Sequence, residues 1–130
     1  MRKTIILLAA TFVLAACQET LEERAAREAR EVTEAKCPMP IGDNMYLDSV
    51  VFDIPSRTQS QHFRFIGESD NDSITTFLGD AKNVLVKELK NTPNYKSLMK
   101  AGVNFHYVYR STNNPQKVYL ETTITPEDYQ

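Results

Sequence analysis

Residues 103–125, VNFHYVYRSTNNPQKVYLETTIT, decide the fold class of this chain. Apolar and polar side chains alternate through 103–110 and again through 117–125, which is the period of a strand with one buried face. The stretch between them, 111–116, is polar and contains the asparagine and proline residues that favour turns. The sequence therefore predicts two strands here, separated by a turn.

A similar pair of strands is predicted earlier in the chain. Residues 45–53 (MYLDSVVFD) and 59–67 (QSQHFRFIG) are rich in β-branched and aromatic residues, and Pro55 lies in the turn between them. A helical pattern separates the two pairs, because apolar residues recur on one helical face at Ile74, Phe77, Leu78, Ala81, Leu85 and Leu89. This order predicts an α+β fold, a mainly antiparallel four-stranded sheet with one long helix on one face.

Two prolines and one glycine mark the ends of the remaining segments. Pro93 interrupts the long helix and starts a short second piece, which Gly102 ends. Pro126 ends the last strand and leaves a short polar tail.

The amino terminus has the pattern of an export signal. Met1-Arg2-Lys3 is cationic, and residues 4–16 form an uncharged, mostly apolar run. A helix of this length spans about 20 Å, less than the roughly 30 Å hydrocarbon core of a bilayer. The pattern therefore predicts a signal peptide over residues 1–16.

The end of this run, Leu14-Ala15-Ala16-Cys17, resembles the lipobox of bacterial lipoproteins. The resemblance implies cleavage before Cys17, transfer of a diacylglycerol to its thiol, and acylation of the freed amine with a chain such as palmitate. Two or three acyl chains anchor a protein stably in a membrane. Gln18 follows the cysteine, which by resemblance to the sorting rule of enteric lipoproteins favours the outer over the inner membrane.

Removal of the leader sets the size and charge of the mature chain. The 130 residues less these 16 leave 114, enough for one domain. The loss of Arg2 and Lys3 changes the formal net charge from −2 to −4. An acidic chain is a poor nucleic-acid binder, because such binding needs a basic surface to release phosphate counterions. We expect no nucleic-acid partner.

Residues 19–36 (ETLEERAAREAREVTEAK) predict a charged helix, since helix-forming residues dominate and Thr20 begins a capping box. One interpretation makes residues 17–37 a lipidated cysteine and helical stalk, before a single α+β domain over 38–130. In the other, the helix docks on the domain or pairs with a partner helix. Pro38 and Pro40 end the helix.

The sequence gives little support to an enzymatic function. It contains no G-x-S-x-G, H-E-x-x-H, C-x-x-C or glycine-rich phosphate loop. With Cys17 acylated, Cys37 is the remaining thiol, and neither histidine is near it in sequence. We expect no metal site, no cofactor and no catalytic residues.

Strand alternation instead predicts a binding surface on the sheet face away from the helix. Cationic and aromatic side chains gather there, a mixture that suits a protein partner or an anionic ligand. The candidate residues are His62, Arg64, His106, Arg110 and Tyr119.

The leading hypothesis is a lipid-anchored cell-envelope protein that acts as a binding or assembly module, with the membrane and an envelope protein as partners. The alternative is a small envelope hydrolase that uses His62 or His106. Overall, the chain resembles the many uncharacterised small lipoproteins of Gram-negative bacteria, particularly of the Bacteroidetes kind. That resemblance rests on the lipobox and layout, and it implies no activity.

Overall fold

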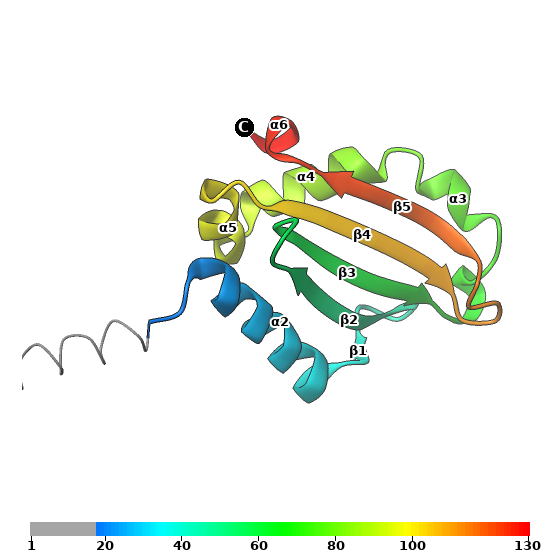
Figure 1. Cartoon of the computed structure of the whole chain (residues 1–130). Coiled ribbons are helices and arrows are strands. Elements are labelled where there is room, and N and C mark those ends of the chain that lie inside the picture. The colour runs from blue at the N-terminus through cyan, green and yellow to red at the C-terminus, as the bar shows by residue number, and fades with distance from the viewer. Residues whose placement is uncertain (1–17) are drawn as a thin grey trace, which may run out of the picture.

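The strands of this chain form one sheet, with helices along one edge and across one face (Figure 1). The computed structural model describes residues 18–130, so the predicted signal peptide and Cys17 lie outside the described residues. The sheet has the order β1-β2-β3-β4-β5. The strands are β1 (Met39–Pro40), β2 (Met45–Asp53), β3 (Thr58–Phe65), β4 (Asn104–Ser111) and β5 (Val118–Ile124).

The sheet is mixed, and the prediction of a mainly antiparallel four-stranded sheet is wrong in this respect. Hairpins β2–β3 and β4–β5 are antiparallel, but β3 and β4 run parallel over their whole length. The helical connection 66–103 returns the chain to the end where β3 began, so β4 must start there. The fifth strand, β1, is too short for an alternation pattern, and its two residues pair with Leu47 and Tyr46.

The connection between β3 and β4 contains several short helices, so the single long helix of the prediction is also wrong. The helices are α3 (Ile74–Phe77), α4 (Ala81–Asn91) and α5 (Lys96–Lys100), with 3₁₀ turns at Gly67–Ser69 and Pro93–Tyr95. The break lies at Gly79 and Asp80. Glycine inside a helix costs about 1 kcal/mol relative to alanine, and aspartate favours caps over helix interiors. Asp80 accordingly precedes α4, and its carboxylate accepts a hydrogen bond from the Asn83 amide at 2.6 Å.

The main core lies between α4 and the sheet face that packs against it, which we call the inner face. Strand alternation assigns six side chains to this face, of which five are buried, and the sixth, Leu120, is partly buried and packs against them. The rings of Phe63 and Tyr109 stack across β3 and β4 at 4.7 Å. The predicted inner residues that are buried are Phe63, Phe65, Phe105, Tyr107 and Ile124.

Helix α2 (Leu21–Lys36) packs along β2 at the sheet edge. Ala25 and Ala29 are buried, and the Thr33 hydroxyl lies 2.9 Å from both the amide nitrogen and the carbonyl oxygen of Val50. The hydroxyl thus bonds backbone groups of β2 that a neighbouring strand would otherwise bond, at a part of the edge that β1 does not reach. This contact protects the edge of β2 from pairing with other chains. Of the two sequence interpretations, these contacts match the docked helix. Independent folding of 38–130 stays a prediction.

A second contact holds the first turn of α2 at one end of the molecule. The guanidinium of Arg57, in the β2–β3 turn, lies 3.1 Å from the Glu22 carboxylate and donates a hydrogen bond to the Ala101 carbonyl. Ala101 directly follows α5. The start of α2 and the end of α5 are therefore joined through one side chain.

The last residues form a short helix, α6 (Pro126–Tyr129), where the sequence predicted a polar tail. A capping box between Thr125 and Asp128 starts it. Tyr129 is buried, and its hydroxyl donates to the Val103 carbonyl at 2.9 Å. The aromatic side chain therefore anchors the carboxyl terminus, because its burial outweighs the polarity of its neighbours. No helix among residues 18–130 has the length and apolar character to span a membrane.

Candidate functional site

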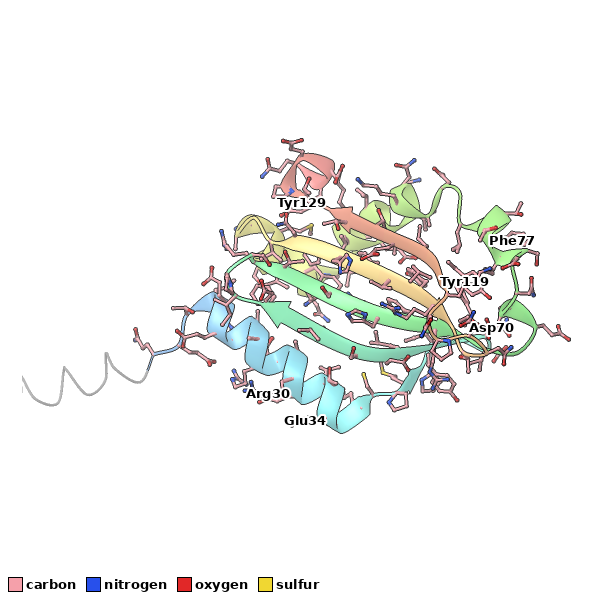
Figure 2. All side chains as sticks on the ribbon, turned by 45° about the vertical axis from the view of Figure 1, so that its right-hand side comes forward. Arg30, Glu34, Asp70, Phe77, Tyr119 and Tyr129 are labelled. Atoms are coloured by element: carbon pink, nitrogen blue, oxygen red, sulfur yellow. The ribbon has the colours of Figure 1, made fainter. Side chains whose placement is uncertain are left out.

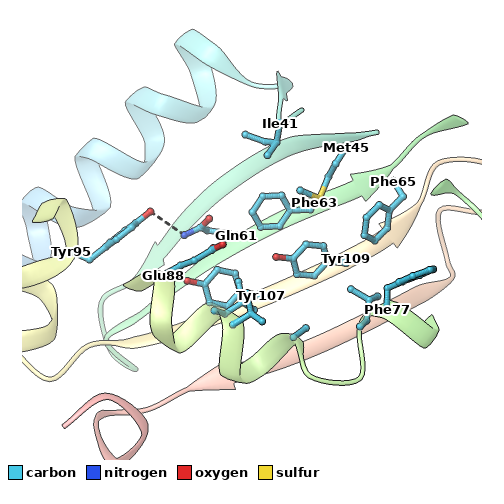
Figure 3. Close-up of a pocket in the computed structure, with 14 residues that line it drawn as sticks. Ile41, Met45, Gln61, Phe63, Phe65, Phe77, Glu88, Tyr95, Tyr107 and Tyr109 are labelled. Carbon is cyan, nitrogen blue, oxygen red and sulfur yellow. Dashed lines mark hydrogen bonds between the residues drawn. The ribbon is translucent and has the colours of Figure 1, made fainter. Parts of the chain in front are cut away.

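An apolar groove lies between the inner sheet face and helices α3 and α4 (Figure 3). It encloses about 450 Å³, within the usual range of ligand pockets. The sequence analysis predicted one unbroken helix over the sheet and no groove at this position. The groove residues are Ile41, Met45, Gln61, Phe63, Phe65, Phe77, Leu78, Ala81, Val84, Leu85, Glu88, Tyr95, Tyr107 and Tyr109.

The rim of the groove leaves large apolar side chains in water. Phe77 on α3, which Figure 2 labels, is 81% exposed, and Val84 on α4 is 51% exposed. Ile41, on the opposite side of the groove, is 36% exposed. Contiguous exposed apolar surface of this kind is typical of interaction sites. The groove is therefore suited to binding an apolar group.

Polar groups gather at one end of the groove. The Gln61 amide donates a hydrogen bond to the Tyr95 hydroxyl at 3.4 Å, and the Glu88 carboxylate lies beside them (Figure 3). Burial, together with the negative charge of Glu88, raises the pKa of Tyr109 to about 12, and burial is the main cause that raises the pKa of Tyr107. Both tyrosines are therefore protonated at neutral pH and can donate hydrogen bonds. Glu88 is the one ionisable carboxylate in the lining.

On the opposite, outer sheet face, the structure brings together four of the five predicted binding residues. Arg64 and Arg110 pair directly across β3 and β4, and the rings of His62 and His106 lie 6.4 Å apart. Burial, followed by the positive charges of His106 and Arg110, lowers the pKa of His62.

Tyr119 lies elsewhere, although strand alternation placed it on the outer face. The register of β4 and β5 shifts between Tyr109 and Arg110, which changes the phase of the strand there. The Tyr119 ring contacts Phe65 at 5.9 Å, and its hydroxyl donates to Asp70 at 2.8 Å. A count of alternating residues does not detect a bulge, so the position of Tyr119 could not be predicted from the sequence.

The cations of the outer face differ in how far the fold already uses them. Arg64 forms an ion pair with Asp48 at 2.8 Å, and its guanidinium lies 4.5 Å from the centre of the Tyr46 ring. Arg110 has no carboxylate within 4.0 Å among residues 18–130. Arg110 is therefore the cation of this face with the most freedom to bind a ligand.

His106 takes part in a hydrogen-bonded chain of the type found in hydrolases. Its Nδ1 lies 3.0 Å from the Ser60 hydroxyl and its Nε2 lies 2.7 Å from the Glu121 carboxylate. A serine, a base and an orienting acid can activate a nucleophile. Acyl transfer also needs amide donors for the developing oxyanion. Ser60 lies on β3 and His106 lies on β4, and each of these strands pairs with a neighbour on both sides. The backbone amides around Ser60 are therefore engaged in hydrogen bonds between strands, which leaves few donors for an oxyanion.

Cys37 lies where α2 meets β1 and is partly buried. Burial, and then the negative charge of Asp48, raises the pKa of its thiol. A raised pKa reduces the thiolate fraction, which makes the sulfur a weaker nucleophile. Within residues 18–130, no three His, Cys, Asp or Glu side chains gather as a metal site.

A family model described as Domain of unknown function (DUF8479) matches residues 20–120, from the cap of α2 into β5. The chain belongs to the DUF8479 family. The matched range includes α2, so the family pattern covers the docked helix as well as the sheet. No curated protein matches the DUF8479 chain.

Solved structures share the fold of this DUF8479 domain at low sequence identity. A Pseudomonas aeruginosa protein described as secreted has a TM-score of 0.61 at 10% identity, over 87% of this chain and 100% of its own. The Vibrio vulnificus type 2 secretion system pilotin EpsS has a TM-score of 0.62 at 11% identity, over 85% and 92%. The Vibrio cholerae type II secretion system pilotin AspS has 0.58 at 16% identity, over 88% and 97%. These similarities concern the fold.

Proposed function

We propose that this chain is a lipid-anchored binding module of the bacterial cell envelope, attached at Cys17, that holds a partner protein without catalysis. The observation that carries the proposal is the open apolar groove with its exposed rim. The shared fold with two secretion pilotins supports an assembly role in the envelope. The lipobox-like Leu14–Cys17 and Gln18 support an anchor in the outer membrane.

The groove selects the chemistry of its occupant. Its floor is aromatic and aliphatic, which suits the apolar side of an amphipathic partner segment. Glu88 adds a negative charge at one end, beside the Tyr95 hydroxyl. The partner segment therefore carries an apolar stripe and a lysine or arginine near one end, placed to meet Glu88.

The outer face of His62, Arg64, His106 and Arg110 is the competing surface for the same function. Its cations favour an acidic partner, in contrast to the basic partner expected for the groove. Both surfaces carry an exposed valine, Val84 at the groove and Val51 on β2, and each is 51% exposed. The chain thus supplies a matched pair of test positions.

The experiment captures partners with the lipidated full-length chain, crosslinked in its native envelope, and then titrates the purified partner. We expect Val84→Glu and Glu88→Lys to reduce affinity at least tenfold, and Val51→Glu to leave it within twofold. Exposed substitutions of this kind should leave the melting temperature nearly unchanged. Loss of binding in Val51→Glu or Arg110→Glu, with Val84→Glu unaffected, would transfer the site to the outer face.

A hydrolase is the second candidate function, because Ser60, His106 and Glu121 form a hydrogen-bonded chain. The shortage of oxyanion donors around Ser60 favours the non-catalytic module over this hydrolase. A fluorophosphonate probe tests the two directly. Labelling of the wild-type chain that Ser60→Ala and His106→Gln both abolish would establish the hydrolase.

A further inference from the structure

Three lysines gather where α4 ends and α5 follows, and we call them the lysine end: Lys90, Lys96 and Lys100. They are exposed and line a shallow depression of about 390 Å³ with Met99 and Tyr129. None of the three has a carboxylate within 4.0 Å in the part of the chain that the structure describes. The sequence has no Asp or Glu between residues 89 and 120. Their positive charge is therefore free to act on a ligand.

The lysine end lies beside the start of α2. Figure 1 shows the first turn of α2 next to α5, and Arg57 joins Glu22 of that turn to the Ala101 carbonyl. Ala101 directly follows Lys100. The position is thus set by specific contacts, and α2 cannot turn away from α5 without breaking them.

The tether between the proposed anchor and α2 is short. Three residues separate Cys17 from Leu21, so the two Cα atoms lie at most about 14 Å apart, whatever the conformation between them. This step rests on the proposed lipidation of Cys17. It requires the membrane surface to be close to the start of α2, and therefore close to the lysine end.

Two of the three acidic residues near the proposed anchor are paired, and the third, Glu23, has no ion-pair partner among residues 18–130. Glu19 forms an ion pair with Arg27 at 2.7 Å, and Glu22 pairs with Arg57 at 3.1 Å. Their negative charge is offset locally, whereas the three lysines keep theirs. Three unpaired lysines against one unpaired carboxylate leave the start of α2 and the lysine end together positive, although the whole chain carries a formal net charge of −2.

We propose that the lysine end contacts the anionic lipid headgroups of the membrane that holds the anchor. The contact gives the anchored domain one orientation on the surface, with α5 against the headgroups. Each lysine near an anionic surface strengthens surface contact roughly fivefold at low salt, so three give about a hundredfold. Salt weakens the contact, because charges are screened over about 10 Å at 0.1 M.

The test places a single tryptophan in the lipidated full-length chain, which has none of its own. Ser97→Trp reports from exposed α5, and Gln116→Trp from the exposed β4–β5 turn at the other end of the sheet. The chain is reconstituted into vesicles of brominated phosphatidylcholine with 30% phosphatidylglycerol, or with none. We expect quenching of Ser97→Trp with phosphatidylglycerol, little quenching of Gln116→Trp, and loss of the difference in 0.5 M NaCl.

The decisive comparison neutralises three cations at the lysine end in one variant and three cations elsewhere in another. Lys90→Gln with Lys96→Gln and Lys100→Gln should lower the quenching of Ser97→Trp severalfold. The matched control, Arg30→Gln with Lys36→Gln and Lys117→Gln, removes the same charge away from the anchor and should not. Equal quenching in both triple variants, or quenching independent of phosphatidylglycerol, would overturn the proposal. So would an acidic protein that binds the lysine end in place of the lipid.

Flotation of the vesicles separates this proposal from the proposed function. A chain that fails to float has no lipid anchor, which contradicts the lipoprotein assignment itself. A chain that floats, but whose Ser97→Trp fluorescence is not quenched, is anchored without the orientation inferred here.

Discussion

The hydroxyl of Thr33 is the most economical test of how α2 belongs to the fold. It lies 2.9 Å from the Val50 amide nitrogen, the Val50 carbonyl oxygen and the Ala29 carbonyl oxygen. One hydroxyl has one hydrogen, so it donates to one carbonyl at a time while it accepts from the Val50 amide. Thr33→Val removes these bonds but keeps the β-branched shape.

The expected loss of stability follows from the Val50 backbone groups that lose the Thr33 hydroxyl as a partner. The Val50 amide loses its acceptor in a partly buried site, and an unsatisfied buried donor costs about 1–3 kcal/mol. The carbonyl loses only a shared donor and retains its second lone pair for water. We therefore expect Thr33→Val to lower the free energy of unfolding by about 1–2 kcal/mol. For a small domain, each kcal/mol corresponds to a fall of roughly 4–8 °C in melting temperature.

Urea unfolding followed by far-UV circular dichroism measures this loss. Thr33→Ser is the control, because it keeps the hydroxyl and should recover most of the stability. If Thr33→Val is as stable as the wild type within about 0.3 kcal/mol, the hydroxyl does not close the edge of β2, and the docked position of α2 has lost its main support.

Four further predictions concern the core, the docked helix, pH and the anchor. Leu89→Ala should cost about 2–5 kcal/mol in urea unfolding, because Leu89 is 2% exposed. A chain of residues 38–130 should melt at a lower temperature in calorimetry, since it lacks the α2 contacts with β2. His62→Gln should weaken the loss of stability below about pH 6.5 in urea titrations, because a lowered folded pKa lets the unfolded state bind the proton first. Cys17→Ser should leave the protein out of the detergent phase in membrane partitioning; unchanged partitioning would contradict the lipid anchor.

The strands and their buried face were predictable because alternation is a local property. Phe105 and Tyr107 are buried while His106 between them is not, as a period of two requires. The break before α4 could have been predicted as well. Gly79-Asp80 combines a poor helix former with a residue that favours helix caps, although the apolar stripe continues across both.

The groove and the parallel pairing could not be predicted from local patterns. The parallel pairing of β3 with β4 depends on where the helical connection returns, over a separation of 38 residues between Phe65 and Val103. The groove depends on α3 and α4 being separate pieces, and the position of Tyr119 depends on a register shift. These features arise from packing between distant segments, which leaves no periodic signal in the sequence.

The docked helix links the two proposed surfaces, because it fixes the sheet relative to the first described residues that follow the proposed anchor. Glu88 and Tyr95 lie at the groove end nearer α5, whereas Phe77 lies toward the β4–β5 turn (Figure 1 and Figure 3). If the lysine end faces the membrane, the acidic end of the groove is the end nearer the membrane. A partner segment in the groove should then place its basic residue toward the bilayer and its apolar stripe away from it. Crosslinks from positions 88 and 77 to one partner segment would show this order directly. The reverse order would mean that the groove and the lysine end are not both oriented as proposed.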